Sequence, residues 1–124
     1  MEQEKTRVAI VGASPDRTKY GNKALRGFAA AGYEVYPINP NYDEIEGFKC
    51  YRNLDELPIR PDIITLYTPP PITEKLVSGL GKYGASEIYF NPGTENDRVK
   101  ELAEEQGLPA IFACSVMARA FFTD

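Results

Sequence analysis

The residues whose types and spacing could do chemistry begin with the segment from Gly12 to Gly21, which follows a short apolar run. Gly12 allows a ligand close to the backbone, and Ser14 offers a hydroxyl group. Arg17 and Lys19 supply positive charge, Arg as a planar fork and Lys as a point charge. The N-terminus of a following helix adds unpaired N–H groups and partial positive charge. Together these features predict a cradle for an anionic group, most naturally a nucleotide phosphate.

The same side chains have ordinary structural interpretations, and the sequence leaves both open. Ser14 can cap the following helix instead of contacting a ligand. The basic residues can form a solvated helix face, although their place beside the glycine turn favours binding. Asp16 is the only acidic residue near them in the sequence, so we expect a locally positive surface on a chain of net charge −4. This basic group comprises Arg17, Lys19, Lys23 and Arg26.

Three further segments rich in turn-forming residues also follow apolar runs. At residues 39–41 the chain has Asn39-Pro40-Asn41, where a typical NAD domain has an acid for the ribose hydroxyls, and an amide there would not repel a ribose phosphate. Thr68-Pro69-Pro70-Pro71 predicts a rigid apolar wall for an adenine face or a pantetheine arm, with helix initiation as the alternative for its last proline. Asn91-Pro92-Gly93-Thr94-Glu95 brings a flexible glycine to the last crossover.

These four segments can meet only if the apolar runs before them are neighbouring strands. Strand and helix patterns alternate along the chain, which predicts an α/β fold: a Rossmann-like, doubly wound parallel sheet of about five strands with helices on both faces. Ligands of such folds bind at the carboxyl edge of the sheet. The predicted strands are 8–11, 34–38, 63–67, 87–90 and 110–113, and the predicted helices are 23–31, 73–83 and 96–106, with a helical turn at 53–57.

Length and composition narrow the class of protein. With 124 residues, of which 43% are hydrophobic, the chain predicts a single domain over 1–124, with 1–6 as an extension and 115–124 as a tail. The apolar residues of that tail predict that it docks on the body or on a partner subunit, which is consistent with a homodimer. They are Val116, Met117, Phe121 and Phe122.

Charge and hydropathy exclude other classes. The net charge of −4 argues against general nucleic-acid binding, which needs a broad basic face. No apolar run is long enough to span a bilayer, and the charged first residues lack the apolar core of a signal peptide. We therefore expect a cytoplasmic protein without membrane attachment.

The chain contains no histidine, which excludes imidazole catalysis, phosphohistidine transfer and histidine-ligated metals from it. Cys50 and Cys114 have no metal-ligand spacing, and we expect free thiols and no metal site. Cys114 follows the last predicted strand, where the preferred interpretation is a small buried cysteine and the alternative is a redox-active thiol. Tyr20, Tyr42 and Tyr67 flank the loops and could stack on a base, with packing as their default role.

Four motifs in sequence order resemble the small stand-alone CoA-binding proteins, a family similar in fold to the CoA-binding N-terminal domain of the succinyl-CoA synthetase α subunit. The resemblance extends over residues 6–114. The motifs are Val8-Ala9-Ile10-Val11-Gly12-Ala13-Ser14, Tyr36-Pro37-Ile38-Asn39-Pro40, Thr68-Pro69-Pro70 and Asn91-Pro92-Gly93.

The resemblance implies that coenzyme A lies across the carboxyl edge of the sheet. By position, Gly12, Ala13 and Ser14 would approach the phosphates, with Arg17 and Lys19 as charge partners and Tyr20 beside them; Asn39 and Pro40 would lie near the adenosine; Thr68, Pro69 and Pro70 would line the middle; and Asn91, Pro92 and Gly93 would close the far side.

We therefore expect a non-catalytic module that binds CoA or an acyl-CoA as a carrier, a sensor or a subunit. The synthetase keeps its phosphorylated histidine in a second domain, so we do not expect ligase activity from this chain alone. One alternative is a redox enzyme or regulator that binds NAD or NADP, although the chain lacks the Gly-x-Gly-x-x-Gly spacing and the ribose-binding acid of such domains. Another is a purely structural partner subunit, which the apolar tail suggests.

Overall fold

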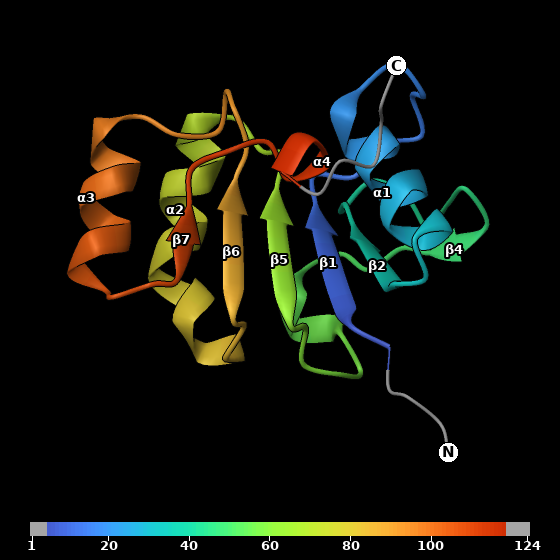
Figure 1. Cartoon of the computed structure of the whole chain (residues 1–124), viewed down its shortest axis with the longest axis horizontal. Helices are drawn as coiled ribbons and strands as arrows, with labels where there is room; N and C mark the ends of the chain where they lie inside the picture. The colour runs from blue at the N-terminus through green and yellow to red at the C-terminus, as the bar shows by residue number, and fades with distance from the viewer. Residues whose placement is uncertain (1–4, 119–124) are drawn as a thin grey trace.

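A five-stranded parallel sheet forms the centre of the computed structural model, which describes residues 5–118 (Figure 1). The spatial order is β2-β1-β5-β6-β7, so β1 has its sequence neighbour β2 on one side and β5 on the other. This places the point at which strand order reverses between β1 and β5. The strands are β1 (Arg7–Val11), β2 (Glu34–Ile38), β5 (Ile63–Leu66), β6 (Glu87–Phe90) and β7 (Ala110–Ile111).

Helices cover both faces of the sheet, which confirms the predicted doubly wound architecture. α1 (Tyr20–Ala30) and the short α4 (Ser115–Ala118) contact each other on one face. α2 (Pro70–Leu80) and α3 (Asp97–Glu105) pack together on the other. In Figure 1, α4 lies beyond the arrowheads of β5 and β1, and α2 lies behind β7.

The sheet divides the apolar core into two parts. Val77 and Phe90 are fully buried on the α2 face, and Leu25 and Phe28 are fully buried on the α1 face. The central strands are covered on both sides, so their side chains are buried along almost the whole length. This explains why they form continuous apolar runs in the sequence.

The connection from β2 to β5 differs from the prediction. It contains an antiparallel hairpin, β3 (Glu44–Ile45) and β4 (Phe48–Lys49), that the sequence analysis missed. Glu46 and Gly47 form its turn with φ values of 53° and 83°, the positive pair that matches the twist of a tight hairpin. The predicted helical turn is confirmed, as the 3-10 helix η1 (Leu54–Glu56).

Several helix and strand ends also differ from the prediction. α1 begins three residues earlier than predicted, at Tyr20, because its first residues, Tyr20-Gly21-Asn22, carry no apolar helical pattern. α2 begins at Pro70 because proline fits the first helical position, and it ends in the 3-10 turn η2 (Gly81–Tyr83). β7 ends at Ile111, two residues before the predicted end.

At the end of the described chain, Ser115 and Val116 are buried, and Val116 belongs to the core on the α1 face. Of the other apolar residues of the predicted tail, Met117 belongs to α4, and Phe121 and Phe122 lie outside the described residues. Within residues 5–118, none of the helices has the length and apolar character needed to cross a membrane.

Candidate functional site

A cleft of about 650 Å³ begins at the carboxyl edge of the sheet, at the reversal point between β1 and β5. Gly12 follows β1, Asn39 and Pro40 follow β2, and Thr68 and Pro69 follow β5, and all five line the cleft. Residues of α2 as far as Leu80 form one wall of the cleft, and the connection that contains η1 forms the other. The absence of a full helix from the described β2–β5 connection leaves this space beside α2.

Gly12 makes the tightest backbone approach in the cleft. Its φ is +88°, and a Cβ there would lie 3.0 Å from the carbonyl carbon of Tyr67. The N–H groups of Gly12 and Ala13 both donate to the carbonyl oxygen of Ile38, at 3.0 and 3.2 Å. The turn therefore touches the ends of both neighbouring strands, and a side chain at position 12 would strain the backbone and push it from β5.

Asn39 holds two of the lining loops together. Its Nδ2 donates to the carbonyl oxygen of Ala13 at 2.8 Å, and its Oδ1 accepts the N–H of Asn41 at 2.9 Å. Ala13 itself is fully buried. The amide of Asn39 thus organises the loops around the cleft rather than projecting freely into it.

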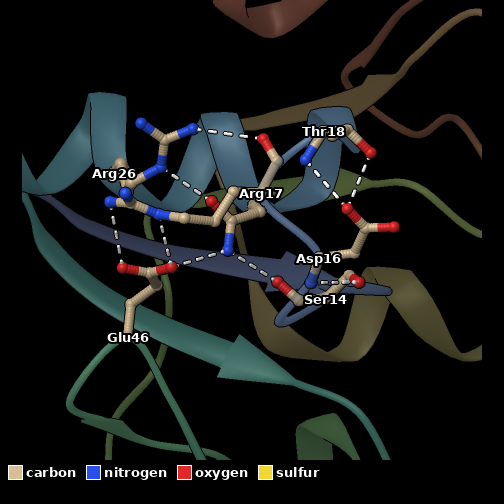
Figure 2. A network of polar contacts seen from close by, with 7 residues as sticks. Ser14, Asp16, Arg17, Thr18, Arg26 and Glu46 are labelled. Carbon is tan, nitrogen blue, oxygen red and sulfur yellow. Dashed lines mark hydrogen bonds and ion pairs between the residues drawn. The ribbon is translucent and has the colours of Figure 1, made fainter.

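A polar network fixes the loop between Gly12 and α1 (Figure 2). Ser14 Oγ accepts the N–H of Asp16 at 3.0 Å, and Asp16 Oδ1 accepts both the N–H and the hydroxyl of Thr18, at 2.9 and 2.6 Å. The hydrogen bonds from Thr18 lower the pKa of Asp16. Ser14 does not cap α1, because the N-cap is Lys19, which makes no side-chain capping bond.

Arg17 is not opposed only by Asp16, as the sequence suggested. Glu46, from the turn of the missed hairpin, accepts from Arg17 Nε at 3.1 Å and from the fully buried Asn22 Nδ2 at 3.0 Å (Figure 2). Arg26 donates to Asn22 Oδ1 and to the carbonyl oxygen of Arg17, at 2.7 and 3.3 Å. The hairpin is therefore tied to the loop and to α1, and Glu46 compensates the charge of Arg17.

We expect the Glu46 contact to make stability depend on acid pH. The hydrogen bond from Asn22, with a smaller contribution from Arg17, lowers the pKa of Glu46 from its ordinary value of 4.5. A lowered native pKa gives a contribution that is present above the unfolded-state pKa and is lost as the pH falls through the native one. Glu46→Gln should thus lower the Tm at pH 7, and the difference from the parent protein should shrink towards pH 3. A difference in Tm that stays constant between pH 7 and pH 3 would contradict this assignment.

The other predicted site residues lie apart from the cleft. Lys19 and Tyr20 are exposed at the start of α1, and Lys23 Nζ lies 4.8 Å from the centre of the Tyr20 ring. Asn91 is buried, and all of its side-chain contacts are within the fold. The predicted residues that do not line the cleft are Ala13, Ser14, Arg17, Lys19, Tyr20, Pro70, Asn91, Pro92 and Gly93.

The sequence analysis missed two basic residues of the cleft, Arg52 before η1 and Lys75 on α2. Neither follows a strand of the main sheet, so the rule that ligands bind at strand ends could not find them. A signal for Lys75 was present, because Ile72, Lys75 and Gly79 are spaced by three and four residues and share one face of a helix. For Arg52 the signal was weaker, since it depends on where a short connection turns.

The chemistry of the lining favours binding. Burial raises the pKa of Tyr67 to about 12, so its hydroxyl stays protonated and bonds Ser115 Oγ at 2.9 Å. Hydrogen bonds from Tyr83 and Lys82 lower the pKa of Asp55. These groups offer hydrogen bonds and apolar surface to a ligand.

Both cysteines are free thiols, as expected, and neither of them lines the cleft. Cys50 is buried, its Sγ lies 3.5 Å from the carbonyl oxygen of Asn39, and burial raises its pKa. Cys114 is half-buried against the core on the α1 face. The buried position of Cys50 suits a structural role.

Comparisons with known proteins give one consistent result. A family model described as "CoA binding domain" matches residues 6–120. The chain is 35% identical over 113 residues to the ADP-forming acetate–CoA ligase of Methanocaldococcus jannaschii, which covers 84% of this chain but only 16% of the ligase. It is 30% identical over 122 residues to the protein YneT of Bacillus subtilis, covering 95% of this chain and 88% of YneT.

The solved structures agree with these matches. A conserved hypothetical protein from Pyrococcus furiosus superposes with a TM-score of 0.83 at 38% identity, covering 92% of this chain and 98% of that chain. The apo acetyl-coenzyme A synthetase 1 of Ca. Korarchaeum cryptofilum, described as dinucleotide forming, gives a TM-score of 0.75 at 27% identity. That match covers 87% of this chain and 26% of the synthetase.

Proposed function

The chain belongs to the CoA binding domain family, and from this premise we propose that it binds coenzyme A or an acyl-CoA in the cleft between α2 and the β2–β5 connection. The observation that carries the proposal is the meeting of three predicted loops at one cleft, at the point where strand order reverses. Such reversal points are where open α/β sheets bind nucleotides.

The chemistry of the lining residues indicates where each part of the ligand binds. The pyrophosphate lies at the Gly12 turn, where the missing side chain lets a ligand approach the backbone. The adenosine lies by Asn39 and Pro40, and the pantetheine arm lies against the apolar surface of Thr68 and Pro69. α1 lacks an acidic residue in the first turn, which leaves its positive end unneutralised by its own side chains.

Arg17 can contact a phosphate through the guanidinium N–H groups that Glu46 does not use, or by exchanging its partner. Its side chain is 66% exposed and can rotate, whereas that of Glu46 is 21% exposed and is held by Asn22. A surface ion pair of this kind contributes little to stability, so a phosphate can replace the carboxylate. We place Ser14, Lys19 and Tyr20 in the same group, as outer contacts that the bound ligand recruits.

The role of the chain is that of a binding module rather than a complete ligase. It spans about a sixth of the length of the ligases that it matches, and its own residues supply no histidine. A carrier, a sensor or a subunit that presents CoA to a partner is the function that fits. The similar length of YneT fits a module that exists as a separate protein.

The test is a thermal-shift comparison of CoA, acetyl-CoA, NAD and NADP, after native mass spectrometry of the purified protein. A ligand at 100 times its Kd adds about 2.7 kcal/mol to stability, so CoA or acetyl-CoA should raise the Tm by several degrees. Gly79→Leu is the matched variant: Gly79 lines the cleft, and a Cβ there would meet no atom within 4 Å.

This variant should keep its Tm without ligand and lose the shift with CoA, because the leucine side chain fills the cleft. A shift with NAD or NADP alone would replace CoA as the ligand and favour the redox alternative. No shift with any of the four compounds would overturn the proposal, and an unchanged CoA shift in Gly79→Leu would move the site out of this cleft.

A further inference from the structure

The charged residues that line the cleft differ in whether their side chains have hydrogen-bond or ion-pair partners. Three of them line it: Arg52, Asp55 and Lys75. Asp55 Oδ1 accepts the Tyr83 hydroxyl at 2.6 Å and lies 3.0 Å from Lys82 Nζ, so its negative charge is already compensated. The two cations therefore dominate the charge of the lining, in a protein whose net charge is −4.

The backbone of Arg52 is fixed by a reciprocal cap at the start of η1. Asn53 Oδ1 accepts the N–H of Glu56 at 3.1 Å, and Glu56 Oε1 accepts the N–H of Arg52 at 3.1 Å. This arrangement resembles a capping box, in which reciprocal hydrogen bonds fix the first turn of a helix. Within residues 5–118 the guanidinium of Arg52 makes no hydrogen bond or ion pair, so all of its donors are available to a ligand.

Lys75 approaches the cleft from the opposite wall. It lies five residues after Pro70, which places it roughly 7.5 Å along α2 from the helix N-terminus. Its neighbours in the lining are Ile72 and Leu76, one turn or less away on the same helix. Its ammonium group likewise has no hydrogen-bond or ion-pair partner in the described part of the chain.

Two unpaired cations thus line the cleft, separate from the Gly12 turn, where we place the pyrophosphate. On the basis of the proposed function, we propose that Arg52 and Lys75 bind a second phosphate of the ligand, the 3′-phosphate of the CoA ribose. They thereby make the cleft select CoA over a dinucleotide such as NAD, which carries a pyrophosphate alone.

Charge and geometry support this pairing. A phosphate monoester carries about 1.5 to 2 negative charges at neutral pH, and a guanidinium can hold it with two parallel hydrogen bonds. A lysine adds a point charge from the opposite side. Leu54 and Leu76 line the same cleft and offer apolar surface to the uncharged parts of the ligand.

The experiment is an isothermal titration of CoA and of dephospho-CoA, which lacks the 3′-phosphate, into the parent protein and two variants, Arg52→Gln and Lys75→Gln. We expect each variant to bind CoA about 10- to 100-fold more weakly, the effect of losing one hydrogen-bonded charge. The parent protein should bind dephospho-CoA more weakly than CoA by a similar factor. The affinity of each variant for dephospho-CoA should be little lower than its affinity for CoA. Lys100→Gln, on α3 and outside the cleft, makes the same change of charge and should bind CoA like the parent.

The outcomes separate this inference from the proposed function. If the parent binds CoA but each variant weakens CoA and dephospho-CoA by the same factor, the two cations do not hold the 3′-phosphate and the inference is overturned. Equal affinity of the parent for CoA and dephospho-CoA overturns it as well. If the parent binds neither ligand, the proposed function itself fails.

Discussion

Gly12→Ala is expected to lower the free energy of unfolding by about 3 kcal/mol and to abolish the proposed CoA binding. A non-glycine residue held in a sparsely populated backbone region costs about 1–3 kcal/mol. The new Cβ would also lie 3.0 Å from the carbonyl carbon of Tyr67, and relieving that contact moves the turn away from β5 and out of the cleft. Urea denaturation measures the loss of stability, and titration with CoA at 10 °C measures binding by the folded fraction.

Gly32→Ala is the control for this prediction. Gly32 has a nearly equal φ of +93°, but a Cβ there would meet no atom within 4 Å and the residue lies outside the cleft. The free energy of unfolding of this variant should fall only by the cost of the backbone strain, and its affinity for CoA should be unchanged. Equal losses of stability in the two variants, with CoA binding intact in both, would show that the close approach to Tyr67 has no energetic consequence.

Asn91→Ala is expected to cost about 3–5 kcal/mol, because the amide joins three parts of the buried core. Its Nδ2 donates to Thr65 Oγ1 and to the carbonyl oxygen of Leu66, both at 2.7 Å, and its Oδ1 accepts the N–H of Ser115 at 2.7 Å. Thr65 and Ser115 are fully buried, so truncation leaves polar groups without partners, at about 1–3 kcal/mol for each such group.

Chemical denaturation should show this loss as a lower midpoint, and hydrogen exchange should show faster exchange of the Ser115 amide. Asn41→Ala is the matched control, because Asn41 is exposed and should lose less than about 0.5 kcal/mol. A loss of stability in Asn91→Ala no greater than in Asn41→Ala would contradict the claim that this amide stabilises the core by joining three of its parts.

The fold was largely predictable because its strands carry strong patterns. β2 and β6 have the predicted ends, since a buried parallel strand bounded by turn residues is a local signal. The hairpin at Glu44–Lys49 was not predictable in this way. Strands of two residues have no period, and Glu46-Gly47 is a weaker turn signal than Asn-Gly or Asp-Gly.

The candidate site was predictable only in part, for a related reason. Gly12, Asn39 and Thr68 follow strands of the main sheet, and topology brings such residues to one edge. Whether a side chain then faces a cleft or the protein depends on contacts from distant segments. Arg17 meets Glu46 across 29 residues, and Asn91 meets Ser115 across 24, so neither pairing could be inferred from local sequence.

The wall of the cleft that carries Arg52 belongs to a connection and not to the sheet. Tyr51 joins that connection to the edge strand β2 through two backbone hydrogen bonds, with Pro37 and Asn39, each 2.9 Å long. Insertions or deletions between residues 41 and 62 would therefore alter the width and charge of the cleft without disturbing strand register. In evolutionary terms, the ligand preference of this domain can change while its core stays the same.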